Sequence, residues 1–293
     1  MIVKKIFDQN NIKSHEFKCI ILFLCLSSFF LTTTIILFVL YKNELKHKLS
    51  TKIIFNRNLE ESSDDRYIPI ISNVSNEGPH ATRGNFDVKN STYFKYIDIY
   101  NMESSGSLIL LEKFKTYQQT SEYTCGPAAL IMAAYYINGT VLNETELAIK
   151  AGANDSVGTL MENLEKLIGD LGYEYESKRS SSSEDDCPSS DPEKFSNYIK
   201  ESLGRKEPII VLSNDWGGHY SVIIGYDDMG TKNYTGDDVI ILADPYDTSD
   251  HRSDGYTIFS YERFYAQMQV PVFDIEEQTL NFIKLIRKNI KSS

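Results

Sequence analysis

The residue best placed for nucleophilic chemistry is Cys125, which begins the apolar run CGPAALIMAAYYI. Because this run is apolar on nearly every side, it predicts a helix buried in a core rather than one on a surface. Proline is tolerated in the first turn of a helix and poorly later, so Pro127 places the helix start at or just after Cys125. The unpaired N–H groups at a helix start favour a thiolate, which makes Cys125 a candidate nucleophile. The alternative is a small, inert core residue.

A thiol nucleophile needs a base, and His219 is the candidate. It begins the segment HYSVIIGYD after a Trp-Gly-Gly turn, whereas the other four histidines lie beside an N-terminal apolar run or in polar segments. If this segment and DVIILAD form a hairpin with Tyr226 opposite Asp238, His219 lies across from Pro245 and beside Asp244. A carboxylate there accepts the ring N–H and stabilises the charged imidazole, so Asp244 is the predicted orienting group. The alternative for His219 is a surface residue at a strand end.

The attack also needs donors for the negative charge that develops on the carbonyl oxygen. The backbone N–H of Cys125 is one donor, and the side-chain amide of Gln119, six residues earlier, is a candidate for the second. Gln118 is an alternative that the residues alone leave open. Gly126 permits close approach of a substrate backbone.

Three ordered segments carry these residues: Gln119-TSEYT-Cys125-Gly126-Pro127-Ala128-Ala129, Gly218-His219-Tyr220-Ser221-Val222 and Ala243-Asp244-Pro245. This pattern resembles the cysteine peptidases that trim double-glycine leaders from bacteriocin precursors, and more closely their stand-alone relatives without a transporter. The resemblance extends from Leu108 to Met268 and implies a papain-like fold with Cys125, His219 and Asp244 as the triad. It assigns the oxyanion donor to Gln119, because glutamine stands six residues before the cysteine in such families. One departure is Thr124, since an acidic residue often precedes the cysteine there.

These residues predict a cysteine-type peptidase or amidohydrolase that works through a Cys-His-Asp triad and an acyl-enzyme intermediate. The expected partner is a peptide or protein substrate. Two alternatives stay open: an acyl or peptidyl transferase that uses the same site, and a peptide-binding module without catalytic activity.

The composition excludes several other classes of function. The 30 Lys and Arg residues against 41 Asp and Glu give a formal net charge of -11, so no basic footprint for nucleic acid is present. The acidic turn after Asp227 fails the EF-hand pattern, because Met229 and Thr231 stand at ligand positions. Zinc spacing, a P-loop, a dinucleotide fingerprint and G-x-S-x-G are all missing. We therefore expect neither a metal nor a cofactor.

The elements that position these residues are predicted from apolar periodicity and turn residues. The patterns predict a first element at 108–117, helices at 144–152, 159–172 and 192–204, strands at 208–213, 219–227 and 238–244, and a strand and helix over 256–268. The Ser- and Asp-rich segment 179–191 predicts a flexible loop. This order predicts an α+β domain, with an N-terminal helical part that contains the buried catalytic helix and a C-terminal antiparallel sheet.

The run from Cys19 to Tyr41 carries no charged residue and is long enough for one transmembrane helix. It lacks the short apolar centre and cleavage site of a signal peptide, which favours an uncleaved, single-pass membrane anchor. Lysines on both sides leave the orientation open by charge. Six N-x-S/T sequons follow the run, which favours a catalytic domain on the extracytoplasmic or lumenal side.

The predicted organisation has five parts. Residues 1–18 form a short polar tail, 19–41 the transmembrane helix, 42–107 a loosely packed stalk or lead-in, 108–274 the papain-like domain, and 275–293 a basic amphipathic tail, helical or frayed. Outside the transmembrane run only Cys125 and Cys187 remain, so Cys125 is predicted to be a free thiol. A disulfide between these two cysteines is the alternative.

Overall fold

The computed structural model describes residues 65–72, 78, 79, 88, 91–178, 188–231, 234–270 and 281–287, all within the compact unit Ile53–Ser293. The predicted tail 1–18, the predicted transmembrane helix 19–41 and most of the predicted loop 179–191 lie outside these residues. Among the residues that are described, no helix is long and apolar enough to cross a membrane.

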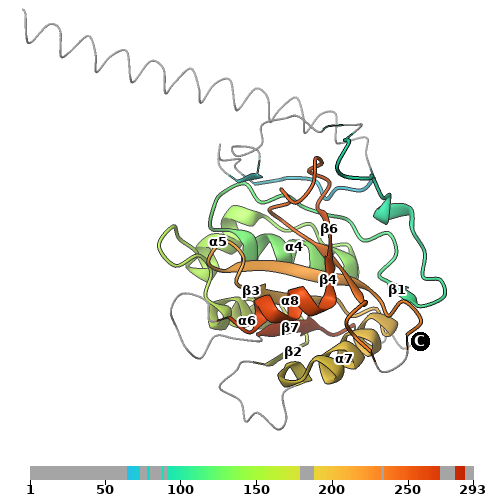
Figure 1. Cartoon of the computed structure of the whole chain (residues 1–293). Coiled ribbons are helices and arrows are strands. Elements are labelled where there is room, and N and C mark those ends of the chain that lie inside the picture. The colour runs from blue at the N-terminus through green and yellow to red at the C-terminus, as the bar shows by residue number, and fades with distance from the viewer. Residues whose placement is uncertain are drawn as a thin grey trace, which may run out of the picture. The chain divides into compact units, whose positions relative to one another are not determined.

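An antiparallel sheet of seven strands forms the centre of the described part of the chain (Figure 1). Its strand order is β2-β7-β3-β4-β5-β6, and β1 pairs with β4. The strands are β1 Leu108–Leu110, β2 Tyr175–Lys178, β3 Ile209–Ser213, β4 His219–Asp227, β5 Val239–Ala243, β6 Tyr256–Ser260 and β7 Phe282–Leu285.

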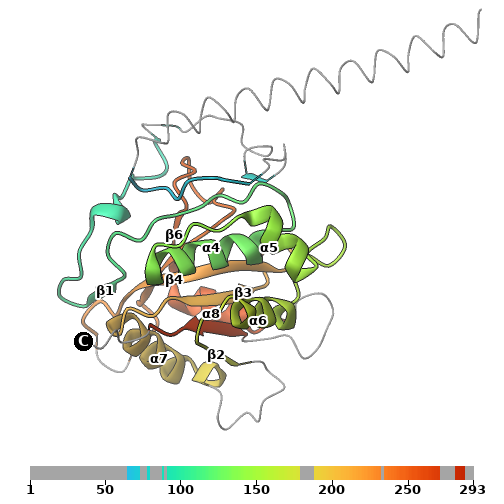
Figure 2. The ribbon, with the colours of Figure 1, turned by 180° about the vertical axis from the view of Figure 1, so that it is seen from behind.

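Five α-helices accompany the sheet within the described residues: α4 Cys125–Asn138, α5 Glu144–Ala151, α6 Met161–Asp170, α7 Pro192–Gly204 and α8 Tyr261–Met268. Two short 3-10 helices, η1 Ile99–Asn101 and η3 Pro188–Ser190, complete the set in this part of the chain. Helix α4 lies on one face of the sheet and α8 on the other, as the two opposite views show (Figures 1 and 2). The α+β class and the antiparallel sheet are as predicted.

Helix α4 begins at Cys125, as its apolar run and Pro127 predicted. The first ten residues of the helix are all buried, because the run is apolar on every side and has no polar face that could be exposed to solvent. The helix ends at Asn138 and is capped by Gly139, whose left-handed conformation (φ +74°) lets its N–H donate to the carbonyl of Tyr135 at 2.7 Å. Helix α4 packs against β4, which brings Cys125 to the strand that begins at His219.

The three helices predicted after α4 are also present. Helix α7 has the predicted bounds, because Pro192 occupies its first turn and the Asp191 side chain accepts the N–H of Lys194 at 2.9 Å. Helices α5 and α6 fall within their predicted ranges.

The predicted register of the hairpin formed by β4 and β5 is wrong. Tyr226 pairs with Ile240 rather than with Asp238, and the register shifts between Ile223 and Gly225. Ile224 has no partner in β5, as in a β-bulge, and its carbonyl accepts the N–H of Leu111 at 2.7 Å. The hairpin prediction did not include this irregularity.

The prediction of a basic amphipathic tail at 275–293 is wrong for Phe282–Leu285, which is strand β7 between β2 and β3. Phe282, Ile283 and Leu285 are fully buried, and Lys284 is 5% exposed. The buried ammonium of Lys284 lies 2.8 Å from the Glu176 carboxylate, so its charge is paired inside the sheet. The domain therefore extends past its predicted end at 274. Its sheet also contains β1, β2 and β7, in addition to the strands predicted between 208 and 260.

The lead-in is not loosely packed throughout. Ile68 is 2% exposed, and its N–H donates to the carbonyl of Thr116 at 3.0 Å. Ile99 and Tyr100 are also buried in the core. The part of the predicted stalk that begins near residue 65 thus contributes to the folded domain.

Candidate active site

Cys125 is the first residue of α4 and is 6% exposed. It is a free cysteine, as predicted. The next residue, Gly126, is also buried, and a Cβ there would lie 3.0 Å from the side chain of Thr159. Close packing against Thr159 therefore requires a glycine at this position, in addition to the substrate approach expected from the sequence.

His219 and Asp244 are in direct contact. The Nε2 atom of His219 lies 2.6 Å from Oδ1 of Asp244, and the two residues are 6% and 8% exposed. His219 begins β4, while Asp244 directly follows β5, so two neighbouring strands hold the pair. The predicted proximity is present although the predicted register is not, because Asp244 follows the paired end of β5 and reaches His219 diagonally.

The thiol of Cys125 lies close enough to the imidazole of His219 to hydrogen-bond it and so affect its pKa. Burial by itself would lower the pKa of His219, but the carboxylate of Asp244 and the bond to Cys125 together raise this pKa well above its usual value. Because Nε2 faces Asp244, Nδ1 is the ring nitrogen left for the sulfur. Asp244 therefore occupies one ring nitrogen of His219, and the other ring nitrogen is left for Cys125.

Several further contacts hold Asp244 in place. Oδ1 accepts the N–H of Tyr246 at 2.8 Å, and Oδ2 lies 3.4 Å from the hydroxyl of Thr257. The backbone carbonyl of Asp244 accepts the side-chain N–H of Gln118 at 2.7 Å. The carbonyl oxygen of the Gln118 amide accepts the N–H of Asp247 at 3.2 Å. Gln118 therefore binds the loop that carries Asp244 at two points, Asp244 and Asp247. Nothing in its sequence context indicated this role.

Gln119, the predicted oxyanion donor, is 1% exposed. Its side-chain N–H donates to the carbonyl of Ser121 at 2.7 Å, and its backbone N–H donates to the carbonyl of Pro245 at 2.9 Å. A primary amide has two N–H groups. The bond to Ser121 uses one of them and orients the amide, and the second N–H stays available as a donor. The structure thus links the segment that contains Gln119 to the loop that contains Asp244.

An aromatic rim borders His219. The rings of His219 and Tyr246 meet edge to face at 6.5 Å, and the ring of Trp216 lies 6.0 Å from that of Tyr246. Trp216 is 72% exposed and has a left-handed backbone (φ +53°), a conformation that is strained for a bulky residue. Tyr220, by contrast, is 2% exposed and lies in the core.

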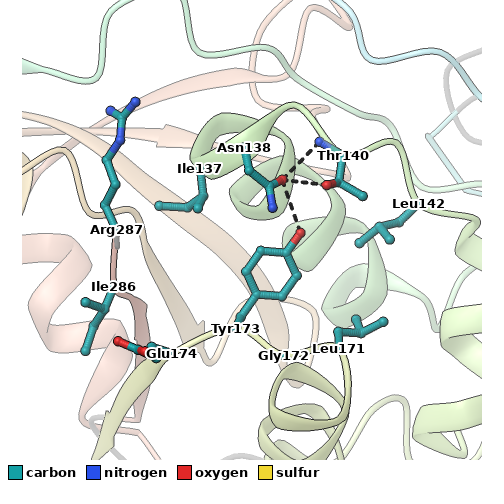
Figure 3. A pocket seen from close by; sticks show the side chains of 10 residues that line it. All are labelled: Ile137, Asn138, Thr140, Leu142, Leu171, Gly172, Tyr173, Glu174, Ile286 and Arg287. Carbon is teal, nitrogen blue, oxygen red and sulfur yellow. Dashed lines mark hydrogen bonds between the residues drawn. The ribbon is translucent and has the colours of Figure 1, made fainter. Parts of the chain in front are cut away.

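A separate cavity of about 390 Å³ contains none of the four predicted site residues (Figure 3). Inside it, the side-chain oxygen of Asn138 accepts from the hydroxyls of Thr140 at 2.6 Å and Tyr173 at 3.3 Å. In the described part of the chain, no group of three or more His, Cys, Asp or Glu side chains is arranged to hold a metal ion.

The comparisons with known proteins point to one family. A family model described as "Peptidase_C39 like family" matches residues 111–270, more than half of the chain. No curated protein sequence matches the chain.

Several solved structures are similar at low identity. The peptidase domain of Streptococcus ComA, a bifunctional ABC transporter of a quorum-sensing pathway, is 21% identical over 60% of this chain and 99% of that chain, with a TM-score of 0.39. A double glycine motif protease from an AMS/PCAT transporter, in complex with the leader peptide, is 17% identical over 58% of this chain and 89% of that chain, with a TM-score of 0.35. UfSP from C. elegans is 14% identical over 65% of this chain and 35% of that chain, with a TM-score of 0.39.

Proposed function

The chain belongs to the Peptidase_C39 like family, and from this premise we propose that it is a cysteine-type peptidase or amidohydrolase with Cys125, His219 and Asp244 as its triad. The observation that carries the proposal is the imidazole of His219, which is buried, lies 2.6 Å from Asp244 and has a pKa that both Asp244 and Cys125 raise. A carboxylate, an imidazole and a thiol in this order form the arrangement that activates a sulfur nucleophile.

In the proposed mechanism, Nδ1 of His219 takes the proton of Cys125, and the thiolate attacks the carbonyl carbon of a peptide bond. Asp244 accepts the Nε2–H throughout and stabilises the imidazolium without taking its proton. The remaining N–H of the Gln119 amide and the backbone N–H of Cys125 bind the oxyanion of the tetrahedral intermediate. His219 returns the proton to the leaving amine, and water then hydrolyses the thioester.

The proposed substrate is a peptide or protein segment. Trp216 supports this choice, because it is a large aromatic side chain held in solvent close to Tyr246 and His219. Such an exposed aromatic surface beside a nucleophile suits contact with the side chains of an extended peptide.

The test is the alkylation rate of Cys125 by iodoacetamide at neutral pH. We expect His219→Ala to slow this rate by at least about tenfold, since the imidazole is the base that accepts the thiol proton. Cys125→Ala should remove the labelling at this site. His251→Ala is the matched control, because His251 packs against Phe94 rather than in the triad, and it should leave the rate unchanged. Equal rates in the wild type and His219→Ala would remove the case for an activated pair.

A further inference from the structure

Glu144 is a buried carboxylate that contacts the segment preceding Cys125. It is 1% exposed and is the first residue of α5. Its oxygens accept hydrogen bonds from the hydroxyl of Tyr117 at 2.8 Å and from the backbone N–H and hydroxyl of Thr120, each at 2.9 Å. The hydroxyl of Thr124 donates the fourth bond. All four donors belong to Tyr117–Thr124, named here the oxyanion loop.

The position of Glu144 is unfavourable for a charged group. Burial raises the pKa of Glu144, and the hydrogen bonds from Thr124, Thr120 and Tyr117 oppose this rise without cancelling it. A carboxylate has two oxygens and about four acceptor positions, which matches the four donors. A glutamine keeps one acceptor oxygen, but its NH2 group would force the hydroxyls of Tyr117 and Thr120, which donate to Oε2, to accept instead.

The three donor residues surround the groups that the proposed reaction needs. Thr120 directly follows Gln119, and Thr124 directly precedes Cys125. The oxyanion loop therefore has its first residue, its middle and its last residue attached to the same carboxylate. Glu144 in this way fixes the distance between the amide of Gln119 and the start of α4.

Glu144 is itself held firmly. Its backbone N–H donates to the hydroxyl of Ser72 at 2.5 Å, and the preceding Asn143 caps α5 by accepting the N–H of Glu146 at 3.0 Å. Ser72 belongs to the lead-in, outside the residues that match the family. The carboxylate thus projects into the oxyanion loop from a rigid helix start.

From these contacts we infer that Glu144 is a positioning residue that holds the oxyanion loop, and with it Gln119, in the geometry that stabilises the tetrahedral intermediate. The inference rests on the proposed function. It predicts that loss of Glu144 impairs reactions that form an oxyanion and spares those that do not.

Two probes of Cys125 separate these reactions. Iodoacetamide forms a C–S bond as the C–I bond breaks and iodide leaves, so no oxyanion arises. With p-nitrophenyl acetate, the sulfur adds to the ester carbonyl, an oxyanion forms, and the C–O bond then breaks to release p-nitrophenolate, while the thiol proton passes to His219. We expect Glu144→Gln to lower the acylation rate by about 10- to 100-fold, the effect of an oxyanion donor displaced by about 1 Å. The alkylation rate should stay unchanged.

Two further variants complete the test. Tyr117→Phe removes one of the four bonds, and we expect it to lower acylation less than Glu144→Gln does, again with normal alkylation. Glu146→Gln removes the same charge from an exposed position in the same helix turn and should leave both rates unchanged. If Glu144→Gln has no melting transition, Tyr117→Phe decides by the same two rates.

The outcomes are distinct. Equal acylation in the wild type and in the variants of Glu144 and Tyr117 overturns the inference, because the loop then does not depend on this carboxylate. A parallel fall of both rates also overturns it, because Glu144 then only supports the fold. A wild type that is acylated no faster than His219→Ala overturns the proposed function itself, and this inference with it.

Discussion

Burial lowers the pKa of His219, whereas Asp244 and Cys125 raise it, and the balance sets the pH range in which the His219–Asp244 ion pair exists. Because the pKa of His219 is raised above its unfolded value, its contribution to stability is complete below the unfolded pKa and is lost as pH rises through the folded pKa. The same raised pKa keeps the imidazole able to hold the thiol proton at neutral pH. The pairing with Asp244 thus serves both the fold and the proposed chemistry.

Asp254 makes the pH dependence of stability testable at a single residue. It is 6% exposed, and burial is the main cause that raises its pKa from 3.8 to about 6. The folded chain therefore holds a proton that the unfolded chain releases, so stability falls as pH rises from 3.8 to about 6. At about 1.4 kcal/mol per pKa unit, this loss is about 3 kcal/mol.

We expect Asp254→Asn to be more stable than the wild type at pH values above this window, with the difference vanishing below it. Asparagine retains an oxygen that can accept the N–H of Tyr256, as Asp254 does at 3.2 Å. The measurement is urea unfolding on both sides of the window, with the exposed Asp155→Asn as control. The same pH slope in Asp254→Asn and wild type would contradict this account.

Strand β4 connects most of the elements that build the site. It pairs with β1, β3 and β5, carries His219 at its first position and packs against α4. Its register irregularity lies at Gly225, where a Cβ would be 2.8 Å from Leu110 and 3.0 Å from Ile241. A side chain at residue 225 would therefore force Leu110 or Ile241 to move.

We expect Gly225→Ala to destabilise the fold by about 1–3 kcal/mol, the usual effect of overpacking a core. Thermal unfolding monitored by circular dichroism checks this. Gly204→Ala is the matched control, since Gly204 is exposed at the end of α7 and a Cβ there meets nothing within 4 Å. A Gly225→Ala chain that melts at the wild-type temperature would show that Leu110 and Ile241 yield without strain.

At the scale of the whole molecule, the sheet joins segments from both ends of the described chain. Strand β7 lies between β2 and β3, and β2 has no other partner strand among the described elements. The family match ends at residue 270, before β7. The folded unit is therefore longer than the segment that carries the proposed catalytic residues.

We expect a chain truncated after Asp274 to lose cooperative unfolding. Removal of β7 takes away three fully buried side chains, Phe282, Ile283 and Leu285. Each contributes about 1.5–3 kcal/mol, so the loss is comparable with a total stability of about 5–15 kcal/mol. A chain that ends at Arg287 retains β7 and is the control. Equal melting curves for the two truncated chains, measured by calorimetry, would show that β7 is dispensable.

Features that depend on neighbouring residues could be predicted from the amino-acid sequence. The apolar run after Cys125 and the early proline specify a buried helix and its first residue, and Asp191 with Pro192 specify the start of α7. The predicted hairpin of two neighbouring strands brought His219 beside Asp244, and the contact is present although the predicted register is wrong. The catalytic roles of Cys125, His219, Asp244 and Gln119 remain predictions.

Features that depend on residues far apart in the chain could be read only from the folded structure. The pattern of Phe282–Leu285 suits a strand or a helix, and only the gap between β2 and β3, with Glu176 to pair Lys284, makes it a strand. Likewise, Glu144 in sequence is an ordinary acid at a helix start, which favours the helix dipole. Its contacts with the oxyanion loop exist only because folding places α5 beside that loop and removes water from between them.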